Sequence, residues 1–168
     1  MKKSYFILLM LVCMFGNLFA GSLDSLIEQD EYHKNGLDVL FFMIADTGFY
    51  QKWATADTPH IVTVVKFKRG QAALPIIIFG TDGKDDSGNA NLTCDLTVIK
   101  PDGSIYAHFD NLIVWKDEPA PTMELSWSRA EIWIEQKDPL GIYRVHAIVH
   151  DNNKKVNVDL NLSFLVEG

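Results

Sequence analysis

Cysteine is scarce in this 168-residue chain, which contains only two, Cys13 and Cys94. Cys13 falls in an N-terminal segment that we expect to be removed, so Cys94 is left without a partner for an internal disulfide. The fold must then be stable through its hydrophobic core alone. Cys94 lies on the apolar side of an alternating stretch, which favours a buried, inert thiol over a catalytic nucleophile.

Apolar runs long enough to cross a membrane are also lacking. A run near the N-terminus, residues 5–15, is free of charge and proline but covers about 11 positions, well short of the roughly 20 needed to span a bilayer. Two lysines precede it and small residues follow, the order of a secretory signal peptide. We predict a signal peptide over residues 1–20, cleaved after Ala20 or, as the second choice, after Ser22. The processed protein is expected in the periplasm or outside the cell, with no membrane span.

Catalytic and cofactor-binding motifs are absent from the sequence. It has no Gly-x-Ser-x-Gly elbow, no His-Glu-x-x-His pair and no glycine-rich phosphate loop. Glu131 and Glu135 share one face of an expected strand, but about 13 Å separates their Cα atoms, a poor fit to a glycosidase pair. His146 and His150 have the same spacing, which favours surface histidines over a zinc site. We therefore predict no catalytic residue, no cofactor and no enzyme activity.

Basic residues are outnumbered by acidic ones. The net charge is −7 at pH 7, and loss of two lysines with the signal peptide lowers it to −9. Such a chain repels phosphate backbones, which argues against nucleic-acid partners. Residues 81–91 form a Gly/Asp/Asn-rich segment in which Asp82, Asp85 and Asp86 offer hard oxygens of the kind that calcium prefers. Their spacing does not match an EF-hand, so a solvated loop is favoured and a metal site is the alternative.

Period-two alternation of apolar and polar residues is abundant. Six apolar residues at even positions of residues 156–166 have polar neighbours, which predicts a strand with one buried face. The same pattern recurs around Cys94 and over residues 143–149. Seven or more such strands without a long helix predict an all-β fold, a sandwich or a barrel of antiparallel sheets. We assign residues 60–168 to the sandwich and residues 21–59 to an N-terminal extension packed on it.

Two elements are predicted inside this extension. Residues 37–45 are nearly all apolar and predict a strand covered on both faces, with a buried helix as the alternative. Residues 49–56 predict one helical turn that carries Phe49 and Trp53 onto the body of the protein.

The stretch from Asp138 to Val145, Asp-Pro-Leu-Gly-Ile-Tyr-Arg-Val, resembles the start of strand F in immunoglobulin-like and fibronectin-III-like sandwiches. This resemblance implies structural roles for Gly141 and for Tyr143, whose hydroxyl returns to the backbone upstream in a tyrosine corner. With the Pro-Asp-Gly turn at residues 101–103, the pattern is similar to a group of small uncharacterised exported proteins of Gram-negative bacteria. The antibody-type disulfide is missing, because Val145 stands where its second cysteine belongs. The resemblance implies an immunoglobulin-like fold, an antiparallel Greek-key sandwich, and no particular activity.

Trp115, Trp127 and Trp133 are the candidate binding residues. Trp127 and Trp133 have the parity opposite to the apolar Ile132 and Ile134, so we expect them on an outer face. Exposed indoles often mark binding surfaces, since each offers a large contact area with a polar edge. The alternative is that the Phe-rich residues 37–53 pack over them.

These observations favour a non-catalytic interaction module of the periplasm or extracellular space. It is expected to bind a protein or another envelope component through an exposed edge strand or through the tryptophan face. The alternative is an envelope enzyme or a calcium-dependent or other metal-dependent protein that uses residues 81–91. A structural domain that assists a partner protein is a third hypothesis.

Overall fold

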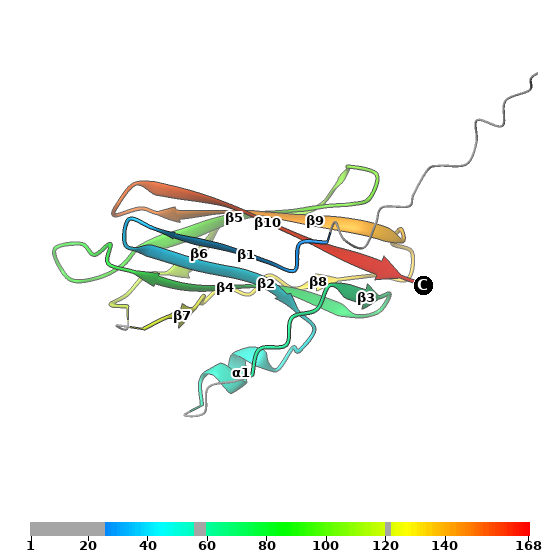
Figure 1. Ribbon diagram of the computed structural model, residues 1–168, viewed down its shortest axis with the longest axis horizontal. Helices are drawn as coiled ribbons and strands as arrows, with labels where there is room; N and C mark the ends of the chain where they lie inside the picture. Colours follow the sequence, from blue (N-terminus) through cyan, green and yellow to red (C-terminus); the bar gives the residue numbers. More distant parts are fainter. Residues whose placement is uncertain (1–25, 56–59, 120–121) are drawn as a thin grey trace, which may run out of the picture.

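The computed structural model describes residues 26–55, 60–119 and 122–168, and the predicted signal peptide lies outside them. Two β-sheets stack face to face and form a sandwich, with one short helix, α1 (Phe49–Trp53), next to the outer face of one sheet (Figure 1). The all-β fold predicted from the alternation pattern is confirmed, and of the two alternatives the chain forms the sandwich. Among the described residues, no helix is long and apolar enough to cross a membrane.

The first sheet is antiparallel and has a central strand, β4, that pairs with three others. Its strands are β1 (Gln29–Lys34), β2 (Leu37–Ile44), β4 (Ala72–Thr81), β7 (Glu124–Leu125) and β8 (Ile132–Trp133). Asn35 and Gly36 join β1 to β2 with φ angles of 55° and 68°, the backbone of a tight hairpin turn. The predicted extension therefore supplies two strands to the same sheet as β4.

The second sheet has the order β3-β10-β9-β5-β6. Its strands are β3 (Lys66–Lys68), β5 (Leu92–Ile99), β6 (Ile105–Trp115), β9 (Gly141–Asp151) and β10 (Val156–Glu167). All neighbours are antiparallel except β3, which runs parallel to the end of β10. The longest pairing in this sheet joins β9 and β10. Its register is unbroken from Val156 with Asp151 to Val166 with Gly141.

The core lies between the sheets, where the residues expected to face inward are buried. In β10 the series from Val158 to Val166 is at most 1% exposed. Strand β2 is covered on both faces, as predicted: Phe41 belongs to the main core, whereas Phe42 belongs to a second cluster with Phe49 of α1. The short helix thus covers apolar side chains on the outer face of the first sheet.

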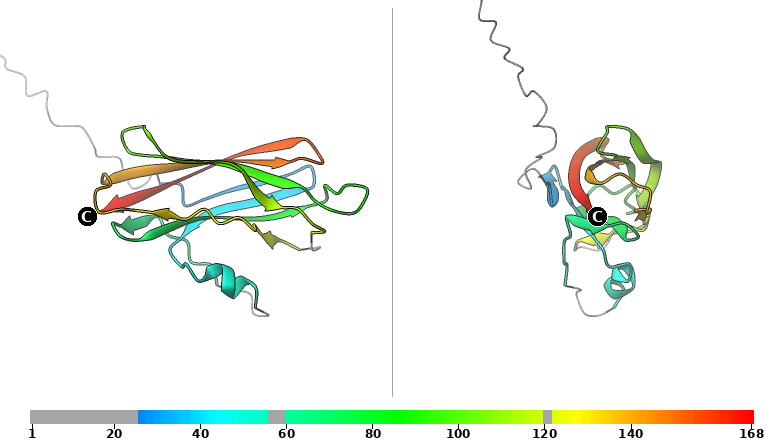
Figure 2. Two further views of the ribbon diagram at one scale, coloured as in Figure 1. Left: turned by 180° about the vertical axis from the view of Figure 1, so that it is seen from behind. Right: turned by 90° about the vertical axis from the view of Figure 1, so that its right-hand side faces the viewer.

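The two sheets are joined along both long sides. On one side β1 lies next to β10 (Figure 2, right, blue beside red). There the amide of Ser163 donates to the carbonyl oxygen of Ile27, and the amide of Asn161 donates to the Asp30 carboxylate. On the other side the segment between β7 and β8 runs beside β6. The outward backbone groups of these border strands are therefore partly occupied, which limits edge-to-edge pairing with other chains.

The corner before β9 has the geometry that the resemblance implies. The Tyr143 hydroxyl donates to the carbonyl oxygen of Pro139 at 3.1 Å. Gly141 has a φ of 128°, and a Cβ atom there would lie 3.1 Å from the Pro101 ring. Both its left-handed backbone and its close contact favour glycine at this position.

Candidate functional site

The segment from Ser126 to Ile134, which follows β7 and includes β8, presents the two exposed tryptophans. Ser126, Ala130, Ile132 and Ile134 are buried in it. The residues with the opposite parity face outward, Glu131 being half-buried and the other three exposed, and we call this set the tryptophan ridge: Trp127, Arg129, Glu131 and Trp133. Trp127 is 49% exposed and Trp133 is 57% exposed, so residues 37–53 do not cover them.

The backbone of the ridge is held at both ends. The amides of Trp127 and Ser128 donate to the carbonyl oxygens of Val114 and Ile113 in β6, at 3.0 and 3.2 Å. At the other end, the Tyr106 hydroxyl donates to the carbonyl oxygen of Trp133 at 2.6 Å. These contacts fix the backbone of the ridge at both ends.

Trp115 has a different place from the other two tryptophans. It is half-buried at the end of β6, with its ring centroid 5.6 Å from that of Phe79 and 4.6 Å from that of Trp127. Its indole nitrogen donates to the carbonyl oxygen of Asp117. Trp115 therefore supports Trp127 from below, and the exposed surface belongs to Trp127 and Trp133.

Arg129 is a ridge residue that was not among the candidates from the sequence, although it has the same parity as Trp127 and Trp133. Its guanidinium lies 4.9 Å from the centroid of the Tyr50 ring and donates to the carbonyl oxygen of Thr47 at 3.2 Å. The Tyr50 hydroxyl donates to the carbonyl oxygen of Ser128 at 3.2 Å, and burial raises the pKa of Tyr50 to about 12. These contacts attach α1 to the middle of the ridge.

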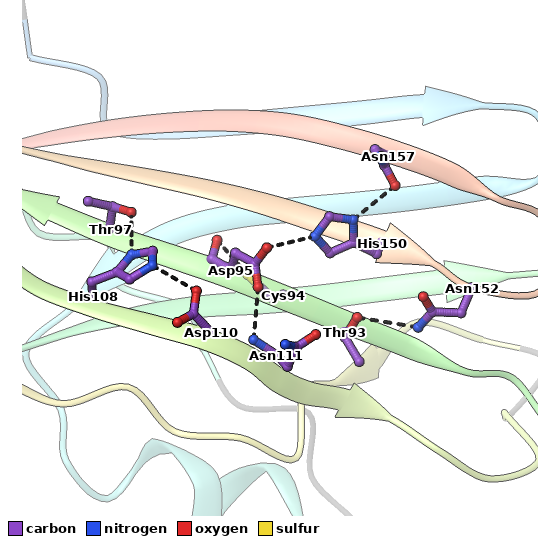
Figure 3. A network of polar contacts seen from close by, with 10 residues as sticks. All are labelled: Thr93, Cys94, Asp95, Thr97, His108, Asp110, Asn111, His150, Asn152 and Asn157. Carbon is purple, nitrogen blue, oxygen red and sulfur yellow. Dashed lines mark hydrogen bonds and ion pairs between the residues drawn. The ribbon is translucent and has the colours of Figure 1, made fainter.

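A separate surface, made of polar side chains, covers the outer face of the second sheet across β10, β9, β5 and β6 (Figure 3). His150 in β9 lies between the Asn157 side-chain oxygen at 2.9 Å and the Asp95 carboxylate at 3.1 Å. Asp95 also accepts from the amide of Asn111, and this bond, together with the one to His150, lowers the pKa of Asp95. A chain of hydrogen bonds thus crosses all four strands, from β10 through β9 and β5 to β6.

The other histidines of this face are paired with acids as well. His146 lies 2.9 Å from Asp159, which lowers the pKa of that carboxyl group, and His108 lies 2.7 Å from Asp110. In each pair the Nε2 atom of the histidine faces a carboxylate oxygen on the outer face of the sheet. The arrangement is that of surface histidines held by neighbouring acids.

Cys94 lies inside the sandwich and is 1% exposed. Burial raises its pKa to about 12, so the thiolate form is disfavoured. A cavity of about 10 Å³ lies beside it, between Ile77 and Leu112, which is close to the space that one water molecule needs. The surroundings of Cys94 are those of an inert core thiol.

Two of the three carboxylates of residues 81–91, those of Asp82 and Asp85, bind groups of the chain itself. Asp82 accepts from the Lys154 ammonium group, and Asp85 accepts from the amides of Ser87 and Asn89 at 2.8 and 2.9 Å. In the described part of the chain, no group of three or more His, Cys, Asp or Glu residues lies close enough together to hold a metal ion. The loop geometry here is that of a self-capped turn.

No protein-family model matches the chain, and no curated protein matches it either. Solved structures with a similar arrangement include a Niemann-Pick type C2 protein from the Japanese carpenter ant. It has 6% identity and a TM-score of 0.41, covering 84% of this chain and 93% of the other. Another is a family 123 glycoside hydrolase from Clostridium perfringens, with 12% identity and a TM-score of 0.42, covering 79% of this chain and 27% of the other.

Proposed function

We propose that this chain is a non-catalytic, exported interaction module that binds a protein partner through the tryptophan ridge. It works in the periplasm or the extracellular space, as the basic and apolar order of residues 1–20 and the resemblance to small exported Gram-negative proteins suggest. The proposal needs neither a cofactor nor a metal. The buried thiol of Cys94 and the acid-paired histidines of the outer sheet face support a binding role over a catalytic one.

The observation that carries the proposal is the exposure of two indoles on a fixed backbone. Trp127 and Trp133 are 49% and 57% exposed, although the alternation of the segment places smaller apolar residues inside. Tryptophan is among the residues that contribute most to protein interfaces, because its large ring loses much apolar surface to water on binding. Two exposed tryptophans on one short segment are therefore better explained by a partner than by the fold.

The edge-strand version of the hypothesis has less support. The pairing of β6 with β5 shifts register at three places, and Asn111 adopts a left-handed backbone with a φ of 53°. Bulges of this kind twist an edge strand and oppose pairing with a foreign strand. The carbonyl oxygens of Ile113 and Val114 are already taken by the ridge.

The test is capture of partners from an envelope extract by the immobilised protein. The double variant Trp127→Ala/Trp133→Ala is expected to lose most of the captured protein, because each hot-spot tryptophan contributes about 2 kcal/mol or more. The matched control is Val62→Ser, which removes an apolar side chain that is 63% exposed outside the ridge. Equal capture by the wild type and the double variant refutes the ridge as the binding surface.

A further inference from the structure

The tryptophan ridge has an order of residues that is complementary to itself. It reads Trp127, Arg129, Glu131, Trp133, with an aromatic ring at each end and opposite charges in the middle. When two copies face each other in antiparallel orientation, with a two-fold axis at Ala130, each Trp127 lies opposite the partner's Trp133. Each Arg129 then lies opposite the partner's Glu131. This is the pattern of an isologous interface, in which the same surface serves both subunits.

We propose that the ridge is the interface of a two-fold symmetric dimer, so that the protein partner is a second copy of this chain. The inference rests on the proposed function, because it names the occupant of the same surface. It adds a defined geometry, an antiparallel face-to-face contact of the two ridges.

Charge complementarity at the centre selects this orientation. Glu131 has no hydrogen-bond or ion-pair partner among the residues that the structure describes. Arg129 donates to one carbonyl oxygen, that of Thr47, and a guanidinium carries five donors, so it has donors left for a carboxylate. A parallel arrangement places Arg129 opposite Arg129 and Glu131 opposite Glu131. Such like-charge contacts are costly, so the antiparallel register is specified by the charges.

Apolar surface at both ends of the ridge supplies the attraction. Next to Trp127, the amide of Ser128 donates to the carbonyl oxygen of Ile113, whose apolar side chain is 42% exposed. In the dimer this end packs against the partner's Trp133. By symmetry the same contact forms twice, with the charged pairs between the two apolar contacts.

The size of the ridge sets the expected affinity. The seven residues from Trp127 to Trp133 span about 20 Å in extended chain, which places the contact at the small end of specific protein interfaces. A contact of this size is expected to form a weak dimer that dissociates on dilution. The fixed backbone of the ridge favours association, because little is ordered when the two copies meet.

The experiment is sedimentation equilibrium of the exported, purified chain over a range of concentrations from about 1 μM to about 1 mM, where contacts of this size dissociate. The wild type is expected to approach the dimer mass at the upper end. Glu131→Arg leaves the contacts of Arg129 with Thr47 and Tyr50 in place and puts two arginines opposite two arginines. It is expected to raise the dimer Kd by about tenfold or more, because like charges then meet at the centre.

The decisive step is a mixture of two charge variants. Arg129→Glu alone places two glutamates opposite two glutamates and is also expected to be monomeric. Mixed in equal amounts, the Glu131→Arg chain and the Arg129→Glu chain present only opposite charges to each other. The mixture is therefore expected to regain the wild-type average mass at equal total concentration. This rescue depends on the two-fold pairing and does not follow from a loss of stability in either variant.

Three outcomes overturn the proposal: a wild type that stays monomeric throughout, a dimer that is indifferent to Glu131→Arg, or a mixture no heavier than the separate variants. The first leaves the proposed function intact if capture from the extract still depends on the two tryptophans, so the two failures are distinguishable. Near-UV circular dichroism verifies the fold of each variant. If Arg129→Glu fails to fold, Trp133→Ala takes its place, with an expected rise in the dimer Kd of about tenfold or more.

Discussion

Tyr143 shows how much one side chain contributes to this fold. It is 1% exposed and stacks on Phe164 at 5.2 Å between ring centroids, while its hydroxyl donates to the carbonyl oxygen of Pro139. Removal of the hydroxyl keeps the ring contacts and leaves that carbonyl without its partner. We predict that Tyr143→Phe lowers the free energy of unfolding by about 1 kcal/mol, measured by urea denaturation. The control is Tyr32→Phe, since the Tyr32 hydroxyl makes no hydrogen bond among the described residues, and an equal loss in both variants contradicts the assignment.

Asp95 links pH to stability on the outer face of the second sheet. Its pKa is lowered in the folded protein, first by the Asn111 amide and then by His150, whereas an unfolded aspartate has a pKa of about 3.9. The carboxylate therefore stabilises the fold above that unfolded value, and the contribution is lost as the pH falls through the lower folded pKa.

We predict that Asp95→Asn is less stable than the wild type at pH 7 and that the difference shrinks as the pH falls below about 4. Urea denaturation of both proteins at several pH values measures this. Asp86→Asn, in the loop between β4 and β5, is the matched control and is expected to show no such trend. A gap between wild type and Asp95→Asn that is constant with pH is incompatible with the proposed linkage.

At the scale of elements, α1 and the strands that it covers form one packing unit. Phe49 is 3% exposed and meets the Phe42 ring edge-on at 6.5 Å between centroids. Because the helix has only five residues, its stability comes from this packing and not from its own hydrogen bonds.

We predict that Phe49→Ala lowers the free energy of unfolding by about 3 kcal/mol, the lower range for a large aromatic deletion in a core. The same substitution is expected to disorder the helix, and faster hydrogen exchange of the amides of residues 49–53 detects this. Tyr50→Phe, which keeps the ring and removes one hydroxyl, serves as the control. A Phe49→Ala protein as stable as the wild type shows that the second cluster is not part of the cooperative fold.

At the scale of the whole molecule, the sandwich depends on its core and on the contacts that join its two sides. Cys94 is the one free cysteine among the described residues and it is buried. We predict that a reducing agent leaves the melting temperature unchanged and that a thiol reagent labels Cys94 only when the protein unfolds. Thermal melting with and without reductant, and labelling as a function of urea, measure the two effects. Fast labelling of the native protein contradicts the burial of Cys94.

The strands and the buried residues were largely predictable, because period-two alternation reports which face of a strand meets the core. The inward series from Val158 to Val166 and the outward parity of Trp127 and Trp133 both follow from that rule. The tyrosine corner was implied by the resemblance at Gly141 and Tyr143. These features depend on neighbours in sequence, so the sequence by itself determined them.

Other features were decided only by the tertiary structure, because they depend on residues far apart in the chain. Parity could not distinguish Trp115, which supports the ridge from β6, from the exposed Trp127. Nor could it place Thr47 and the α1 residue Tyr50 next to Arg129, some eighty positions away. Alternation predicts that a side chain points outward, whereas its neighbours in space are known only from the fold.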